Sequence, residues 1–113
     1  MSYLNEIAFI GLSKEEYVFK AYTIDTNFKD IPAVYVITKR YPNGSGFSHD
    51  PYYIGITNDL PARLNGHHKL QACINAGANC ICVHQDNLNS SREMKEKDLI
   101  KKYAPKMNDS LKP

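Results

Sequence analysis

The stretch AVYVITKRYPNGSGFSHDPYYIGIT, residues 33–57, decides the fold of this chain. Its first part, residues 33–41, is rich in β-branched and aromatic residues, which is typical of a buried strand. Residues 52–57 have the same character, and an Asn-Gly pair between the two parts is the strongest short signal for a hairpin turn. We therefore predict an antiparallel hairpin over 33–57, with residues 42–51 as its loop.

The segments on either side of the hairpin predict further strands and helices. Alternation of side chains indicates an early strand, and a capping-box pattern of Ser90 and Glu93 indicates the start of the last helix. Gly77 and Pro105 are expected to end helices. We expect a strand at 16–25, helices at 60–69, 69–76 and 91–103, and a strand at 79–85.

These elements predict a mixed α/β (α+β) domain with a small central antiparallel sheet of three strands flanked by helices. Residues 33–113 form its main part, and residues 1–32 are an N-terminal extension that can add an edge strand. The chain has 113 residues, 42% hydrophobic and 23% charged, which fits one globular domain.

Composition excludes several classes of protein. No apolar run approaches the roughly 20 residues of a membrane span, and the N-terminus lacks the basic start of a signal peptide. Three cysteines are an odd number, so reduced thiols in a cytoplasmic protein are expected. The net charge of +2 is too small to indicate a nucleic-acid partner by itself.

The last predicted helix carries a carboxylate in its apolar stripe. The stripe consists of Leu99, Ile100 and Tyr103, and Glu96 projects into its middle at about 100° per residue. An ionised carboxylate among apolar neighbours is costly to desolvate. Either a partner satisfies it, namely Arg63, Arg92 or a backbone amide, or Glu96 binds a metal ion. Glu93, on the flank of the same face, is a weaker rival for both roles.

Two pairs of polar residues are candidates for one pocket. Arg63 and His67 are four residues apart and would share one face of a helix. The guanidinium suits a phosphate, and the imidazole can orient a nucleophile or contact a phosphate. Tyr35 and Tyr53 lie on the two strands of the hairpin and could face the same pocket. Taken singly, each of the four has an ordinary interpretation as a surface or packing residue.

In combination these residues resemble the GIY-YIG nuclease family. Residues 33–35 correspond to the first tripeptide of the family, with Ala33 in place of its first glycine, and residues 53–55 are the second tripeptide intact. Arg63 and His67 follow at the spacing typical of the family's catalytic helix. The stretch 96–108, EKDLIKKYAPKMN, resembles the family's closing motif, and the resemblance covers about 33–108.

The resemblance implies an endonuclease that hydrolyses phosphodiester bonds in DNA with one Mg²⁺ or Mn²⁺. Glu96 would hold the ion, Arg63 would stabilise charge on the phosphoryl group, and Tyr35 would act as general base or orient the water. The implied assisting and supporting residues are Tyr53 and His67, which assist or contact phosphate, Gly55, which allows close backbone approach, and Asn108, which braces the site.

The implied partner is DNA, contacted through phosphates rather than bases. The expected contacts are Lys39, Arg40, Lys69, Lys95, Lys101 and Lys102. Low sequence specificity, a homodimer and a targeting partner protein all stay open. The main alternative is a nucleic-acid-binding module without catalysis on the same fold, and a structural or inhibitory interaction protein is a third.

A zinc site is a rival use of the thiols. Its ligands would be Cys73, Cys80, Cys82 and His84, with His67 or His68. The residues at 80, 82 and 84 alternate onto one face of a strand, yet this spacing is not a common zinc motif. Cysteine is also among the most buried residue types, so inert core thiols are favoured.

Overall fold

A computed structural model describes residues 3–65 and 67–109, without the side chains of His68 and Asp109. In chain order the elements are β1 (Tyr3–Ile10), β2 (Glu16–Thr23), β3 (Ala33–Asn43), β4 (Gly46–Thr57), α1 (Leu60–Leu64), α2 (His68–Asn75), β5 (Cys80–Gln85), α3 (Asn89–Tyr103) and α4 (Lys106–Asp109). The mixed class is confirmed. No helix in the described ranges is long and apolar enough to cross a membrane.

The sheet has five antiparallel strands in the order β1-β2-β5-β3-β4, so the predicted number of three was wrong. The N-terminal segment supplies two strands, and β2 lies inside the sheet, between β1 and β5. Tyr17, Phe19 and Ala21 of β2 are buried while Val18 and Lys20 are exposed, which is the alternation that predicted this strand. The first residues are therefore part of the sheet rather than an appendage.

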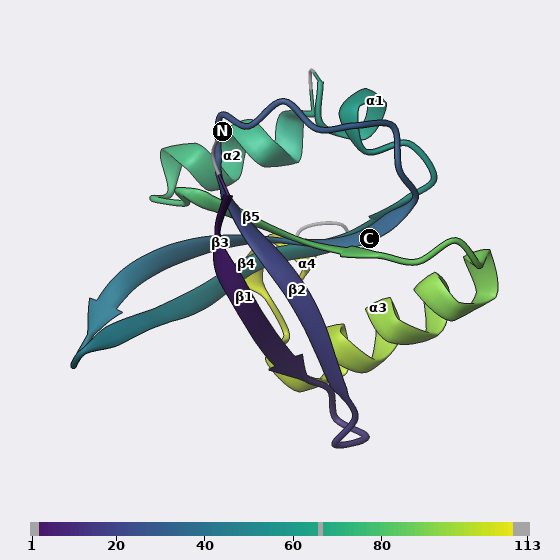
Figure 1. Ribbon diagram of the computed structural model, residues 1–113, viewed down its shortest axis with the longest axis horizontal. Coiled ribbons are helices and arrows are strands. Elements are labelled where there is room, and N and C mark those ends of the chain that lie inside the picture. The colour runs from purple at the N-terminus through teal and green to yellow at the C-terminus, as the bar shows by residue number, and fades with distance from the viewer. Residues whose placement is uncertain (1–2, 66, 110–113) are drawn as a thin grey trace.

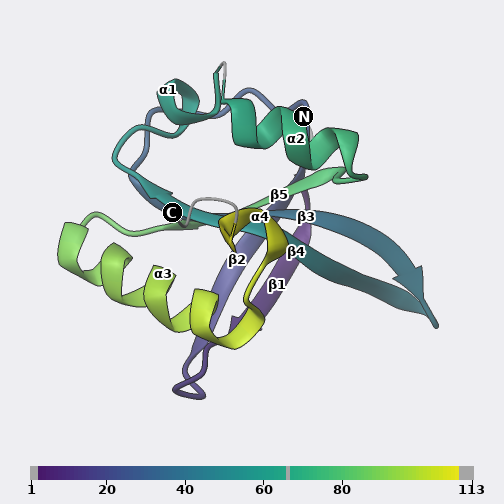
Figure 2. The same ribbon diagram turned by 180° about the vertical axis from the view of Figure 1, so that it is seen from behind.

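The hairpin of β3 and β4 was predicted correctly, but its loop is much shorter than expected. Gly44 and Ser45 form the turn, with Gly44 at φ +63°, and most of the predicted loop at 42–51 continues the two strands. The ladder closes from Asn43 opposite Gly46 inward. In both views of the molecule the paired strands extend beyond the rest of the sheet as an arm (Figures 1 and 2).

A β-bulge interrupts this ladder and turns two tyrosines to the same side. Ile37 pairs with Tyr53 and the next residue, Thr38, pairs with Pro51, so Tyr52 is the extra residue on β4. Both Tyr52 and Tyr53 are buried in the core that also contains Tyr35. The bulge lies directly beside the second tripeptide.

The helices cover opposite faces of the sheet. Helices α1 and α2 lie on one face and α3 on the other (Figure 1), over two separate cores. The first core includes Tyr35, Leu64 and Cys73; the second includes Phe19, Cys82 and Leu99. The sheet curls around the second core, so that the ring of Phe9 on β1 lies 6.3 Å from the imidazole of His49 on β4.

The predicted helix at 60–69 was wrong in its second half. Asp59 caps α1 and Pro61 lies in its first turn, as expected, but α1 ends at Leu64. The chain then becomes extended, and His67 serves as the N-cap of α2. Gly77 follows α2 with φ +118°, as predicted for the residue that ends it.

Helix α3 begins at Asn89, and the predicted capping box of Ser90 does not form: the N-cap is Leu88, without a side-chain cap. Asp86 organises this helix start instead. Its carboxylate accepts hydrogen bonds from the Leu88 N–H and the Ser91 hydroxyl, and it forms an ion pair with Lys95 at 2.8 Å. An acceptor two residues before the N-cap thus replaces the capping residue.

Candidate active site

Tyr35, Tyr53 and His67 gather at the face of the sheet covered by α1 and α2. The hydroxyl of Tyr35 lies 3.3 Å from Nε2 of His67. The two tyrosine rings have centroids 6.2 Å apart, and the ring of His67 lies 5.7 Å from that of Tyr53. Three residues that are far apart in sequence therefore form one cluster of phenols and imidazole.

Gly55 makes room for the phenol of Tyr35. The two residues face each other directly across β3 and β4. A Cβ atom at position 55 would lie 2.6 Å from both Cζ and Oη of Tyr35, closer than any real contact of this kind. Because Tyr35 is fully buried, its ring cannot simply move away. The glycine of the second tripeptide is thus required by the tyrosine of the first.

The hydrogen bonds of His67 define its tautomer. Nδ1 accepts from the backbone N–H groups of Lys69 and Leu70 at 2.9 and 3.2 Å. In the neutral imidazole the proton is therefore on Nε2, where it can be donated to the hydroxyl of Tyr35. The sequence predicted that His67 shares a helix with Arg63. Instead, His67 reaches Tyr35 from the start of α2, whereas Arg63 lies on α1.

Arg63 and Glu96 place opposite charges near this cluster. Arg63 is exposed in the last turn of α1, and Glu96 is partly buried on α3. The pKa of Tyr53 is raised first by burial and then by the charge of Glu96, while Arg63 lowers it. Both charges act on Tyr35 in the same directions. The charges of Arg63 on α1 and Glu96 on α3 therefore both act on the two phenols, although these helices cover opposite faces of the sheet.

Burial raises the pKa of the Glu96 carboxyl, and the neighbouring Glu93 raises it further, while Lys97 and Arg63 lower it. No hydrogen bond or ion pair holds this carboxylate within the described ranges. Arg92, one of the partners considered from the sequence, is buried and donates to the carbonyl of Asp86 and the side chain of Asn89 instead. Glu96 is therefore a partly desolvated carboxylate whose charge is only weakly compensated.

Asn108 fixes the backbone of β4 next to Gly55. Its side chain accepts from the N–H of Ile54 at 2.8 Å and donates to the carbonyl of Ile54 at 2.9 Å. Asn108 is buried, and both bonds go to one residue of the edge strand of the sheet. An amide that both accepts from and donates to the backbone of one residue braces the strand beside the site.

The cations expected to contact DNA differ in their surroundings. Lys39, Lys101 and Lys102 are exposed. Arg40 stacks its guanidinium over the ring of Phe47 at 3.6 Å. Lys95 is engaged, with Asp86 at 2.8 Å and with Nε2 of His84 at 2.9 Å. Lys95 would have to leave these partners to contact a phosphate.

A cavity of about 530 Å³ lies apart from this cluster and is lined by residues 24–28 and by α1 residues such as Pro61 and Ala62. None of Tyr35, Tyr53 or Arg63 lines it. Asp25 is the one ionisable side chain among the described residues of its lining, so the cavity does not bring together the phenols, imidazole and guanidinium of the cluster.

The residues predicted as possible zinc ligands do not all lie together in the structure. Cys73 lies in the first core, on the opposite face from Cys80 and Cys82. His84 bonds the carbonyl of Val18 through Nδ1 at 2.8 Å. The side chain of His68 lies outside the described residues.

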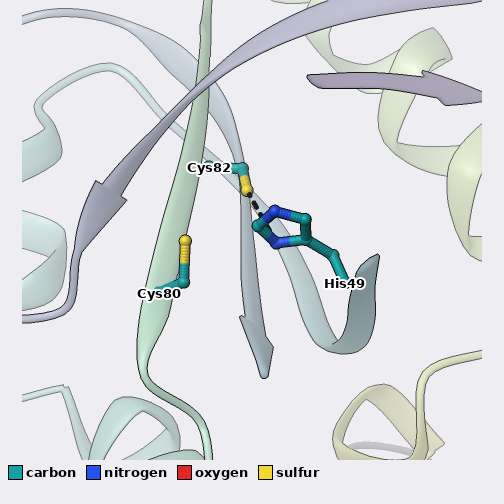
Figure 3. A group of neighbouring side chains, drawn as sticks. All are labelled: His49, Cys80 and Cys82. Atoms are coloured by element: carbon teal, nitrogen blue, oxygen red, sulfur yellow. Dashed lines mark hydrogen bonds between the residues drawn. The ribbon is translucent and has the colours of Figure 1, made fainter. Parts of the chain in front are cut away.

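His49 approaches the two cysteines instead, and sequence reasoning missed it. The ligand atoms of His49, Cys80 and Cys82 lie within 4.8 Å of one another (Figure 3). Position 49 was assigned to a loop, so its register was unknown. Continuing the hairpin ladder through Pro42 would have paired His49 with Arg40 and indicated which face it occupies.

No protein-family model matches this chain, and searches of curated proteins and of solved structures found no match either.

Proposed function

We propose that the chain is a divalent-metal-dependent endonuclease that hydrolyses phosphodiester bonds in DNA. The observation that carries the proposal is the convergence of Tyr35, Tyr53 and His67, with Arg63 and Glu96 acting electrostatically on the same phenols. These are the five residues for which the resemblance to GIY-YIG nucleases implies catalytic roles.

Arg63 is the group that binds the phosphate and stabilises its developing charge. It is exposed on a short helix beside the cluster, and its charge acts on both phenols. A guanidinium offers a planar set of N–H donors that matches phosphate oxygens. Such a preorganised donor contributes most when charge grows on the phosphoryl group during the reaction.

Tyr35 orients the attacking water, with His67 holding its hydroxyl. Burial is the main cause that raises the pKa of Tyr35, so the phenol is protonated at neutral pH. Because Nε2 of His67 donates to the phenol oxygen, the hydroxyl proton of Tyr35 is directed away from His67, and the side chain of Tyr53 is a hydrogen-bond partner for it. Of the two roles implied for Tyr35, this arrangement favours orientation over general base. Tyr53 contacts the phosphate from the neighbouring strand.

Glu96 fits one Mg²⁺ or Mn²⁺. Its carboxylate is a hard oxygen donor, partly buried and without a bonded partner in the described part of the chain. Magnesium commonly binds through one or two carboxylates, and keeps waters and substrate phosphates as its other ligands. The ion would supply Lewis-acid stabilisation of the phosphate and its leaving oxygen. A proton competes with the metal ion for the Glu96 carboxylate. Because the pKa of Glu96 is raised, metal affinity should begin to fall at a higher pH than it would for an ordinary glutamate.

The proposal is tested by nicking of supercoiled plasmid with and without Mg²⁺ or Mn²⁺. We expect cleavage only with the ion, and Arg63→Ala should slow it by about 100-fold or more, since one charge-stabilising donor is typically worth that. Lys29→Ala, which removes an exposed cation elsewhere, is the matched control. Equal rates in Arg63→Ala, or cleavage without any divalent ion, would contradict the proposal. DNA binding without cleavage would favour the non-catalytic alternative.

A further inference from the structure

We propose that His49, Cys80 and Cys82 bind a thiophilic metal ion, zinc in the first instance, inside the curl of the sheet. This site is separate from the proposed nuclease site and does not depend on it. Its ligands come from strands β4 and β5, and the second core surrounds it. The sequence pattern indicated Cys80 and Cys82 as candidate ligands but not His49.

The geometry assembles the ligands on one face of three adjacent strands. Cys80 and Cys82 are two residues apart on β5 and therefore point to the same side. Sγ of Cys82 lies 3.8 Å from Nδ1 of His49, which reaches over from β4. Figure 3 shows the imidazole beside the two sulfur atoms. Strands rather than loops carry all three side chains, which favours a precise arrangement of the ligands.

The imidazole of His49 has an unsatisfied nitrogen. Nδ1 lies 2.8 Å from the hydroxyl of Thr38, but Nε2 is buried without a hydrogen-bond partner in the described ranges. A buried polar atom without a partner is costly, and one that persists calls for a bound ion or water to explain it. Coordination through Nε2 would leave Nδ1–H to donate to Thr38, the outer-shell hydrogen bond typical of metal-bound histidine.

The charge of the ligand set also fits its surroundings. A Zn²⁺ ion with two thiolates and a neutral imidazole has no net charge, which suits a core in which both cysteines are fully buried.

The donor set selects the class of ion. Two sulfurs and one imidazole nitrogen favour zinc or Cu(I) over Mg²⁺, which prefers oxygen. Three protein ligands leave zinc a fourth position for water or another ligand. The ion would join β4 to β5 near the base of the projecting arm, because His49 pairs with Arg40 where the two strands leave the sheet.

The test is a titration of reduced, metal-free protein with Co²⁺, followed by Zn²⁺ competition. We expect one ion per chain, a thiolate-to-cobalt absorption band and its loss when zinc is added. Competition with a chromophoric Cu(I) chelator in a parallel experiment measures copper affinity. The ratio of Cu(I) affinity to zinc affinity is compared with the same ratio for unstructured peptides that contain two cysteines and one histidine. A higher ratio in the protein would assign the site to copper and overturn zinc. Absence of stoichiometric binding by both ions would overturn the proposed site.

Variants identify the ligands. Cys80→Ser and His49→Gln should weaken binding by more than about 100-fold, since changes to outer-shell partners alone cost up to that. Cys73→Ser and His84→Gln are matched controls that remove the same groups from positions outside the cluster, and they should bind as the wild type does. If Cys80→Ser does not fold, His49→Gln decides, because His49 is only partly buried. Unchanged affinity in His49→Gln, or a loss in His84→Gln, would overturn the assignment.

Discussion

The two faces of the sheet carry two clusters of chemically opposite character. On the face of α1 and α2, the hydroxyl of Tyr35 lies beside the imidazole of His67, and α1 carries the exposed guanidinium of Arg63. On the face of α3, two buried sulfurs of the second core lie near the partly buried imidazole of His49. One cluster offers oxygen and nitrogen groups, and the other offers two sulfurs and a nitrogen.

Strand periodicity produces this division. Along β3, Tyr35 and Ile37 face the first core while Val34 and Val36 face the second, because side chains alternate in a strand. The difference teaches that side-chain alternation in one sheet can place oxygen and nitrogen groups on one face and sulfur groups on the other. Conditions that affect one face should therefore leave the other largely unchanged.

Salt should separate the two faces most strongly. DNA affinity should fall by at least about 10-fold between about 50 and 200 mM salt, because phosphate contacts by Arg63, Lys101 and similar residues release counterions. Zinc affinity should change little, since the two cysteine ligands are buried. Filter binding and cobalt competition in the same buffers measure both. A DNA affinity that does not depend on salt would point to another kind of partner.

Gly55→Ala should disturb the cluster around Tyr35 and leave metal binding at His49, Cys80 and Cys82 unchanged. The added methyl group would meet the buried ring of Tyr35, and such overpacking typically costs about 1–3 kcal/mol. Nicking should fall strongly because the phenol is displaced from His67, while cobalt binding persists at temperatures where the variant is folded. Gly46→Ala, with open space around position 46, is the control. Wild-type stability and nicking in Gly55→Ala would show that the contact is not a constraint.

Glu96→Gln should have the smallest effect on stability. The folded-state pKa of Glu96 is raised, so the metal-free wild type loses stability as pH rises through the interval between its unfolded and folded pKa values. Glutamine removes this loss. At neutral pH the variant should equal or exceed the wild type by no more than about 1 kcal/mol, since the group is partly solvated.

Urea unfolding of both proteins in chelator at pH 3.5 and 7 measures this difference, which should disappear at the lower pH. Excess Mg²⁺ should then stabilise the wild type and not Glu96→Gln. A loss of about 3–5 kcal/mol in the variant would instead mean that Glu96 belongs to a buried ion pair. In that case its role would be structural.

Local patterns predicted the part of the fold that depends on local chemistry. Gly44 in the hairpin turn, Pro61 at the start of α1 and Gly77 after α2 all lie where their backbone preferences place them, although the turn consists of Gly44 and Ser45 rather than of Asn43 and Gly44. The arm was missed because residues 46–51 are polar and contain a proline. They remain in strand geometry because the partner strand and the bulge at Tyr52 hold them there.

Local sequence patterns were also insufficient to predict how the two clusters assemble. Spacing along the chain singled out Tyr35, Tyr53 and His67, yet His67 reaches the cluster as an N-cap after a break in the helix, which no helical spacing predicts. The cluster of His49, Cys80 and Cys82 depends on strand order. Strand β3 lies between β5, which carries the cysteines, and β4, which carries His49. A non-local pairing of this kind leaves no local signal, so His84 was considered in place of His49.

The most direct test of the proposed function compares wild type and Glu96→Gln in Mg²⁺ at equal, saturating DNA occupancy. The concentration of Mg²⁺ is varied without chelator, so that the comparison concerns this ion alone. The proposal predicts that both proteins bind DNA, that the wild type nicks it, and that the variant does not. Nicking by the variant at the wild-type rate, or no nicking by DNA-saturated wild type in either Mg²⁺ or Mn²⁺, would contradict it.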